Sequence, residues 1–186
     1  MGLDLNFLFV NALNGVVYGA FLMLTSLGLS LVFGLGRVVN FAHGALYALG
    51  GYAVVAAMER LGAAYWLALV VAPIPVIVVA IAIERATIYP IRNRPEIDTL
   101  LVTFGMSFML IGSIEYIWGT GTTLVRVPPA LGGTIQIFGN PFPFYRLVAA
   151  GVSLLMSAGV FAFMQFTPIG LRVRAIAGDP GMAAAR

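Results

Sequence analysis

The chain lacks residue types on which several kinds of functional site depend. Its 186 residues include no cysteine, a single histidine (His43) and ten basic residues, all of them arginine. Without lysine the chain cannot form a P-loop, whose lysine contacts the nucleotide phosphates. The same composition excludes disulfides, thiol nucleophiles, cysteine-based zinc sites and multi-histidine metal sites. We therefore expect no metal or cofactor bound by this chain and no enzymatic activity.

Charge is scarce as well. Only 9% of the residues are charged and 61% are hydrophobic, whereas soluble domains contain about 25% charged residues. The arginines are scattered singly between apolar runs, so the pI near 9.6 reflects charges that flank a membrane and not a basic patch for nucleic acid. The composition predicts an all-α polytopic membrane protein in a lipid bilayer, with no nucleic-acid partner.

Five uncharged runs predict about five transmembrane helices, since a spanning helix needs about 20 apolar residues. Pro73 and Pro75 fall in the middle of the third run and predict a kink or break there. The start of the second run, residues 40–52, can also be read as a re-entrant segment. The expected spans are residues 7–33, 38–58, 61–83, 99–114 and 147–171.

The spans form a single transmembrane domain over residues 1–186, and the segments between and after them are expected outside the membrane. Residues 119–146 are rich in Gly, Pro and Thr and hold two β-favouring pieces, 124–127 and 134–138, which predict a small hairpin. Seven of the ten arginines fall on the inner side if the N-terminus lies outside. This orientation makes 119–146 an external loop and places the tail 172–186 in the cytoplasm.

Polar and small residues gather at helical spacing at the start of the second span. One hypothesis is that this face lines a solute path, because ionisable residues within a membrane are functional candidates and helix N-termini suit carboxylates. The alternative is helix packing, with Gly44 and Ala48 as a small-xxx-small pair. The sequence does not decide between these two hypotheses. Asn40 lies where its side chain could cap the start of the helix. The face consists of Asn40, His43, Gly44, Tyr47 and Gly51.

Two other spans carry weaker patterns. Gly15 and Gly19 have the GxxxG spacing of packed membrane helices. Thr99, Thr103 and Ser107 repeat every four residues in the fourth span. Hydroxyls often bond to carbonyls of their own helix, but Thr103 and Ser107 are also candidates for the solute path.

Three stretches carry motifs in a fixed order. The first is Gly-Arg-Val-Val-Asn-Phe-Ala-His-Gly at 36–44, continuing to Gly-Gly-Tyr at 50–52. The second runs from Tyr-Pro-Ile-Arg at 89–92 to Asp-Thr-Leu-Leu-Val-Thr-Phe-Gly at 98–105, and the third is Gly-Leu-Arg-Val-Arg-Ala at 170–175. Together they resemble the LivH-type permease subunits of branched-chain amino-acid ABC importers. Members of that family continue past Arg186, so the chain resembles an N-terminal part of a permease.

The resemblance implies translocation of branched-chain amino acids by alternating access in the bacterial plasma (inner) membrane. It implies a second permease subunit, two cytoplasmic ATP-binding subunits that use ATP and Mg, and an external solute-binding protein. Residues 172–186 match the start of the family's cytoplasmic coupling loop, which contacts the ATPase. The coupling candidates on this match are Arg172, Arg174, Asp179 and Arg186.

Three alternatives stay open. A urea or short-chain amide ABC permease has a very similar signature. An ion-coupled secondary transporter would need buried acids near mid-membrane, whereas the seven acids here fall at predicted span ends or outside the spans. A membrane scaffold without transport would tolerate replacement of Asn40 and His43 with no loss of uptake.

Overall fold

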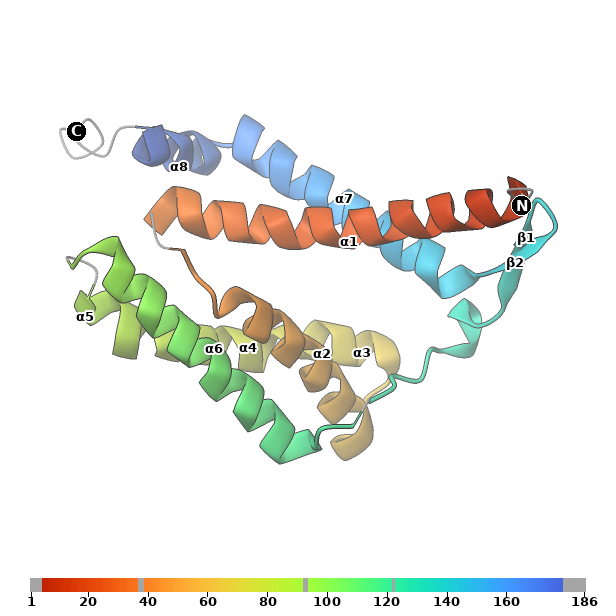
Figure 1. The fold of residues 1–186 in the computed structure, drawn as a ribbon, viewed down its shortest axis with the longest axis horizontal. Coiled ribbons are helices and arrows are strands. Elements are labelled where there is room, and N and C mark those ends of the chain that lie inside the picture. Colours follow the sequence, from red (N-terminus) through yellow and green to blue (C-terminus); the bar gives the residue numbers. More distant parts are fainter. Residues whose placement is uncertain (1–4, 37–38, 92–93, 122, 179–186) are drawn as a thin grey trace. The chain divides into compact units, whose positions relative to one another are not determined.

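The computed structural model describes residues 5–36, 39–91, 94–121 and 123–178. These residues form helices, one two-stranded hairpin and short connections (Figure 1). The chain divides into two compact units. One comprises Met1–Leu35 with Val127–Arg186, and the other comprises Gly36–Arg126.

Four described helical stretches are long and apolar enough to cross a membrane, which confirms the all-α prediction. The remaining predicted span corresponds to α2 (His43–Arg60), which has 18 residues and is about 27 Å long at 1.5 Å per residue. It begins later than predicted, after a non-helical turn. The four stretches are Leu5–Gly34, Tyr65–Ile91, Glu96–Trp118 and Phe144–Phe166.

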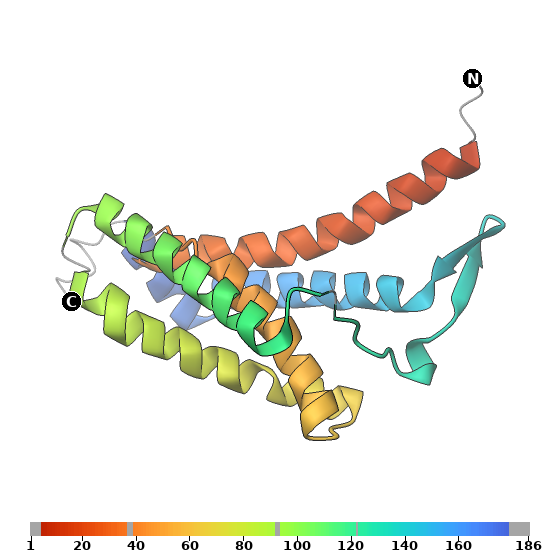
Figure 2. The ribbon, with the colours of Figure 1, turned by 60° about the horizontal axis from the view of Figure 1, so that its bottom comes forward.

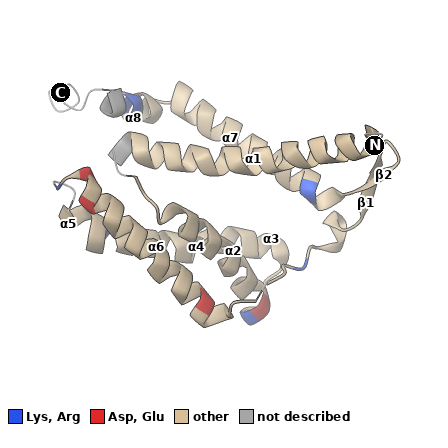
Figure 3. Ribbon diagram, viewed as in Figure 1, with Lys and Arg blue, Asp and Glu red and all other residues tan. Residues whose placement is uncertain are grey.

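Charged residues lie near the ends of the long helices (Figure 3). The 32-residue α1 (Leu5–Gly36) has none. In α6 (Glu96–Trp118) two acids occupy the first turn, where they interact favourably with the helix dipole. The middle of each long helix is therefore left without formal charge, as a hydrocarbon environment requires.

The first unit contains α1, a short 3-10 turn, the hairpin and the two last helices. Figure 2 shows α7 following directly from the hairpin. Val17 and Ala20 of α1 are buried with Phe142 and Ala150 in one apolar cluster. Beside this cluster, Arg146 Nη1 donates to Asn14 Oδ1 at 3.1 Å. The elements are η2 (Pro129–Leu131), β1 (Thr134–Ile137), β2 (Asn140–Pro143), α7 (Phe144–Phe166) and α8 (Pro168–Gly178).

The hairpin pairs different residues from those predicted. β1 pairs antiparallel with β2, whereas residues 124–127 form no strand. Pro141 and Pro143 hide the strand character of β2, because proline cannot donate to a sheet ladder. The turn places Phe138 at φ +49° and Gly139 at φ +80°, the pair of positive φ angles that suits a tight two-residue hairpin. Phe138 also packs edge-on against Phe9 of α1, with ring centroids 4.9 Å apart.

In the second unit α2 packs against α3 (Tyr65–Val71), α4 (Pro73–Ile83) and α6. The predicted break in the third span is present at Ala72, between α3 and α4. Pro73 and Pro75 cannot donate backbone hydrogen bonds. Ala72 N–H still donates to Ala68 O at 2.8 Å, so the interruption stays local and the span continues.

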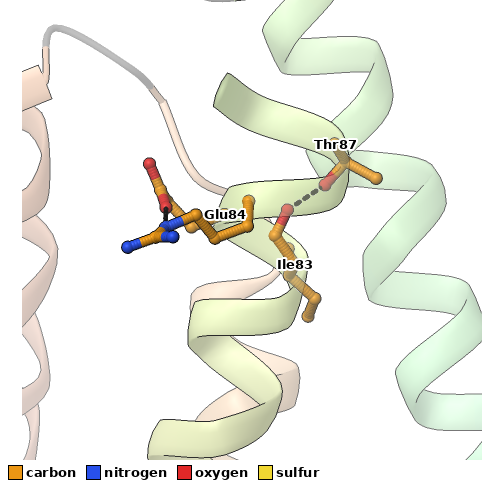
Figure 4. Close-up of polar contacts among 4 residues, drawn as sticks. Ile83, Glu84 and Thr87 are labelled. Atoms are coloured by element: carbon orange, nitrogen blue, oxygen red, sulfur yellow. Dashed lines mark hydrogen bonds and ion pairs between the residues drawn. The ribbon is translucent and has the colours of Figure 1, made fainter. Parts of the chain in front are cut away.

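The helix continues beyond the predicted end of this span at residue 83. A π-helical turn, η1 (Glu84–Ile88), and the short α5 (Tyr89–Ile91) extend the helix past its first charges. Figure 4 shows the Thr87 hydroxyl donating to the carbonyl of Ile83. The Glu84 carboxylate lies 3.7 Å from Arg85 Nε. Uncharged runs mark where a helix is apolar, but the helix itself extends beyond them.

The predicted last span, 147–171, is divided by a corner at Thr167. The Thr167 hydroxyl accepts the Gly170 N–H at 3.1 Å and donates to Phe163 O at 2.6 Å. Thr167 therefore caps the N-terminus of α8, with Pro168 in the first helical position. Gly170 is buried, and a Cβ there would overlap the backbone carbonyl of Met164.

We predict that Gly170→Ala destabilises this corner, because the added methyl group forces the two backbone segments apart. Overpacking of this kind costs about 1–3 kcal/mol. The measurement is the thermal unfolding midpoint of the full-length protein purified in detergent. Gly159→Ala is the matched control, since its Cβ would meet nothing within 4 Å. Equal midpoints for the two variants would contradict the prediction.

Candidate functional site

A non-helical turn at residues 39–42 precedes α2. Asn40 Oδ1 accepts the Ala42 N–H at 3.0 Å, and the Asn40 carbonyl accepts the His43 N–H at 3.2 Å. Ala42 occupies the N-cap position, so the prediction that Asn40 caps the helix directly is wrong. Asn40 instead folds the preceding backbone into a turn through its side chain, as Asn commonly does.

The hydroxyl of Thr103 on α6 binds this turn. Phe41 N–H donates to Thr103 Oγ1 at 3.3 Å, and Oγ1 lies 3.1 Å from both Val39 O and Leu100 O. The single hydroxyl hydrogen therefore serves Val39 O, Leu100 O or both. Thr103 is fully buried, at 0% exposure, where unpaired backbone groups are costly. The predicted bond to its own helix carbonyl is present, but the bonds to another segment were not foreseen.

Aromatic contacts add to the hydrogen bonds between this turn and α6. The rings of Phe41 and Phe104 meet edge-on with centroids 5.9 Å apart, and Phe104 meets Phe108 at 4.9 Å. The sequence did not predict these ring contacts. Neither the residues around Phe41 nor those around Phe104 indicate by themselves that the two segments meet. Ser107, the other candidate on this helix, is half-buried. Within the described residues its hydroxyl makes no hydrogen bond.

The predicted polar face of α2 is the open face of that helix. Gly44 and Gly51 are exposed, His43 is half-buried and Tyr47 is 63% exposed. A Cβ added to Gly44 would meet nothing within 4 Å. Among the described residues, therefore, no packed helix explains the small-xxx-small spacing of Gly44 and Ala48. The geometry favours an open surface over packing within this unit.

Two cavities follow this face. One of about 530 Å³ lies between α2 and the α3–α4 helices and includes Tyr47 and Gly51 in its lining. Another of about 430 Å³ also includes Gly51 and extends to Tyr52, Val55, Thr120, Gly121, Thr123 and Val125. Because Gly51 lines both, the hollowed surface continues from the middle of α2 towards its C-terminal end.

That end is marked by an aromatic and cationic cluster. The Arg60 guanidinium lies 5.7 Å from the ring centroid of Trp118, and the Tyr52 and Trp118 rings are 5.2 Å apart. Tyr and Trp are enriched at membrane boundaries, so these rings fit the end of a membrane helix. The sequence pattern did not identify Arg60 as the partner of Trp118, because the two residues belong to different helices.

The coupling candidates lie on and beyond α8. Arg174 donates from Nη1 to the side-chain oxygen of Gln165 and from Nη2 to the Gln165 carbonyl at 3.3 Å. These bonds tie α8 to the end of α7. Arg172 is exposed. Asp179 and Arg186 lie outside the described residues.

The chemistry open to these residues is binding through hydrogen bonds and apolar contact. The described residues contain no group of three or more His, Cys, Asp or Glu side chains that could hold a metal ion. In the same part of the chain, the His43 imidazole makes no hydrogen bond. The site therefore offers a turn, a helix N-terminus and an open helix face.

We predict that Thr103→Val destabilises the protein by about 1–3 kcal/mol, the usual cost of leaving buried polar groups unpaired. Valine keeps the shape of threonine but cannot bond to the 39–41 backbone. Thr103→Ser should restore most of the loss. Thr99→Val is the matched control, because Thr99 is also buried on α6 and makes no side-chain hydrogen bond within the described residues. Thermal unfolding of the full-length protein measures the effect, and equal losses at both threonines would contradict the assignment.

The sequence of this chain is similar to those of known proteins. The family described as "Branched-chain amino acid transport system / permease component" matches residues 11–186. The high-affinity branched-chain amino acid transport system permease protein LivH of Salmonella typhimurium is 28% identical over 183 residues, covering 91% of this chain and 59% of the relative. LivH of Escherichia coli K12 shows the same identity and coverage. The corresponding permease protein BraD of Pseudomonas aeruginosa is 26% identical over 180 residues, covering 89% and 58%.

The chain thus spans less than two thirds of the length of these relatives. No solved structure is significantly similar to it. The family match includes the 39–42 turn, the open face of α2 and the α7–α8 corner. The chain belongs to the family of branched-chain amino acid transport system permease components.

Proposed function

We propose that this chain belongs to an ABC importer permease that carries branched-chain amino acids across the bacterial inner membrane by alternating access. The observation that carries the proposal is the open, cavity-lined face of α2, which begins at a backbone turn held by Thr103. The family match supplies the class of solute. The chain serves as a transport component and not as an enzyme.

The turn at 39–42 and the start of α2 suit the carboxylate of an amino acid. The N–H groups of Phe41, Ala42 and His43 already bond to Thr103 and Asn40. The next N–H groups of the first turn, those of Gly44 and Ala45, have no intrahelical partners, and discontinuous membrane helices present such groups to anionic solutes. Gly44 is exposed and has no side chain to cover that end. Asn40 and His43 add hydrogen-bonding groups beside it.

The rest of the path is apolar with a few polar groups. Tyr47 contributes a hydroxyl, and the cavity beside it is lined largely by aliphatic residues of α2, α3 and α4. A branched aliphatic side chain gains from apolar contact, while the polar groups orient its charged end. Thr103 acts as a positioning residue in this scheme, because its hydroxyl bonds to backbone and not to solute. Ser107 remains a candidate for the path.

Energy must come from other subunits, because a chain without lysine has no P-loop lysine. We propose two cytoplasmic ATP-binding subunits that use ATP and Mg, a second permease subunit and an external solute-binding protein. The N-terminus then lies outside, and α8 lies on the cytoplasmic side. Arg172 is exposed there for contact with an ATPase, and Arg174 holds α8 to α7 so that a push on α8 reaches the membrane helix.

The test is uptake of labelled leucine by cells that lack their own importer and express the full-length permease with its partner subunits. We expect uptake that isoleucine and valine inhibit, that urea does not inhibit, and that stops when the ATP-binding subunits are inactivated. His43→Ala should lower uptake at equal membrane abundance and unchanged assembly, because it removes a polar group from the path. Leu155→Ala is the control, since Leu155 is 75% exposed on α7.

Three results would contradict the proposal. Uptake of urea without uptake of leucine would assign the chain to an amide importer. Leucine uptake that persists with inactive ATP-binding subunits would indicate ion coupling. Normal uptake by His43→Ala would remove His43 from the solute path.

A further inference from the structure

A third cavity lies at the C-terminal end of the open face of α2. Its volume is about 330 Å³, at the lower end of the range for small-molecule sites. It is enclosed by the last turns of α2 and by the extended segment that follows α6. The lining residues are Val55, Met58, Glu59, Leu124, Val125 and Arg126.

This cavity continues the surface already described. Val55 and Val125 line both this cavity and the 430 Å³ cavity beside it. Through Gly51 the hollowed surface reaches Tyr47. All of these residues belong to the unit Gly36–Arg126. The cavity is therefore one end of the face to which we assign the solute path.

Two residues of opposite charge line the cavity, and they do not form an ion pair with each other. Within the described residues, neither Glu59 nor Arg126 takes part in an ion pair. The neighbouring Arg60 lies over the Trp118 ring, which gives that cation a different partner. Glu59 and Arg126 are both exposed. A carboxylate and a guanidinium are thus available to a solute at one apolar-walled cavity.

We propose that this cavity is an entry site for an α-amino acid with an aliphatic side chain. Glu59 binds the ammonium group, Arg126 binds the carboxylate, and Val55, Leu124 and Val125 contact the side chain. Guanidinium groups bind carboxylates through paired hydrogen bonds, and aliphatic walls favour an apolar side chain. The inference rests on the proposed function and adds to it the groups that recognise a zwitterion.

The experiment measures leucine binding to the full-length permease complex in nanodiscs, without the solute-binding protein, by saturation-transfer NMR. Leucine methyl protons should receive strong saturation. Glu59→Gln and Arg126→Gln should each weaken binding roughly ten-fold, as loss of one charge-assisted hydrogen bond predicts, while Glu59→Asp recovers most of the affinity. Leucine analogues that lack one charge, 4-methylpentanoate and 3-methylbutylamine, should bind the native complex more weakly.

Matched controls separate this effect from a general change of charge. Glu115→Gln removes an exposed acid near the same end of α6 as Trp118, and Arg85→Gln removes an exposed arginine near Glu84. Neither residue lines the cavity, so both variants should bind leucine as the native complex does. Thermal unfolding of each variant verifies that it is folded.

Each outcome decides the proposal. If the native importer takes up leucine but Glu59→Gln and Arg126→Gln bind it normally, the entry site is refuted and the proposed function stands. If these variants only lower ATPase stimulation by the solute-binding protein, the two charges contact that protein and not the solute. If the native importer takes up no branched aliphatic amino acid, the proposed function fails and the entry site fails with it.

Discussion

The hydroxyl of Thr103 supports the part of the structure on which the proposed transport role depends. Apolar helices in a bilayer leave no water for a broken backbone, so every freed N–H and carbonyl needs a partner within the protein. The turn at 39–42 interrupts the helical backbone, and Thr103 supplies bonds to Val39 and Phe41 from a fully buried position on α6. A short helix can begin at His43 because the backbone before it is paired.

The consequence is a helix with two different sides. One side of α2 packs against α3, α4 and α6. The polar face carries Gly44, Tyr47 and Gly51, and Tyr47 and Gly51 line a cavity between α2 and the α3–α4 helices that continues into a second one. An open helix face with glycine and tyrosine is poorly suited to contact with lipid. It suits a passage for a small polar solute. Among the described residues that line these cavities, the charged ones are Glu59 and Arg126, which lie where this face ends.

Much of this arrangement was predictable from the sequence, for identifiable reasons. Long uncharged runs located the helices, Pro73 and Pro75 located the break at Ala72, and spacing placed Gly44 and Tyr47 on one face. The partner of β1 was not predictable, because β2 holds two prolines that argue against a strand. Contacts between distant segments were equally hidden. The bonds of Thr103 to Val39 and of Arg174 to Gln165 depend on how helices pack, which no local pattern records.

The central claim is that the open face of α2 borders water and solute rather than lipid. Because this chain has no cysteine, a single introduced cysteine on the face can be labelled without reaction elsewhere in these residues. The measurement is the reaction of Tyr47→Cys in the assembled importer with a small membrane-impermeant thiol reagent. The control is Leu155→Cys, at an exposed position in the middle of the apolar helix α7. We predict rapid labelling of Tyr47→Cys that leucine slows, and no labelling of Leu155→Cys. Equal resistance of both cysteines to the reagent would contradict the account.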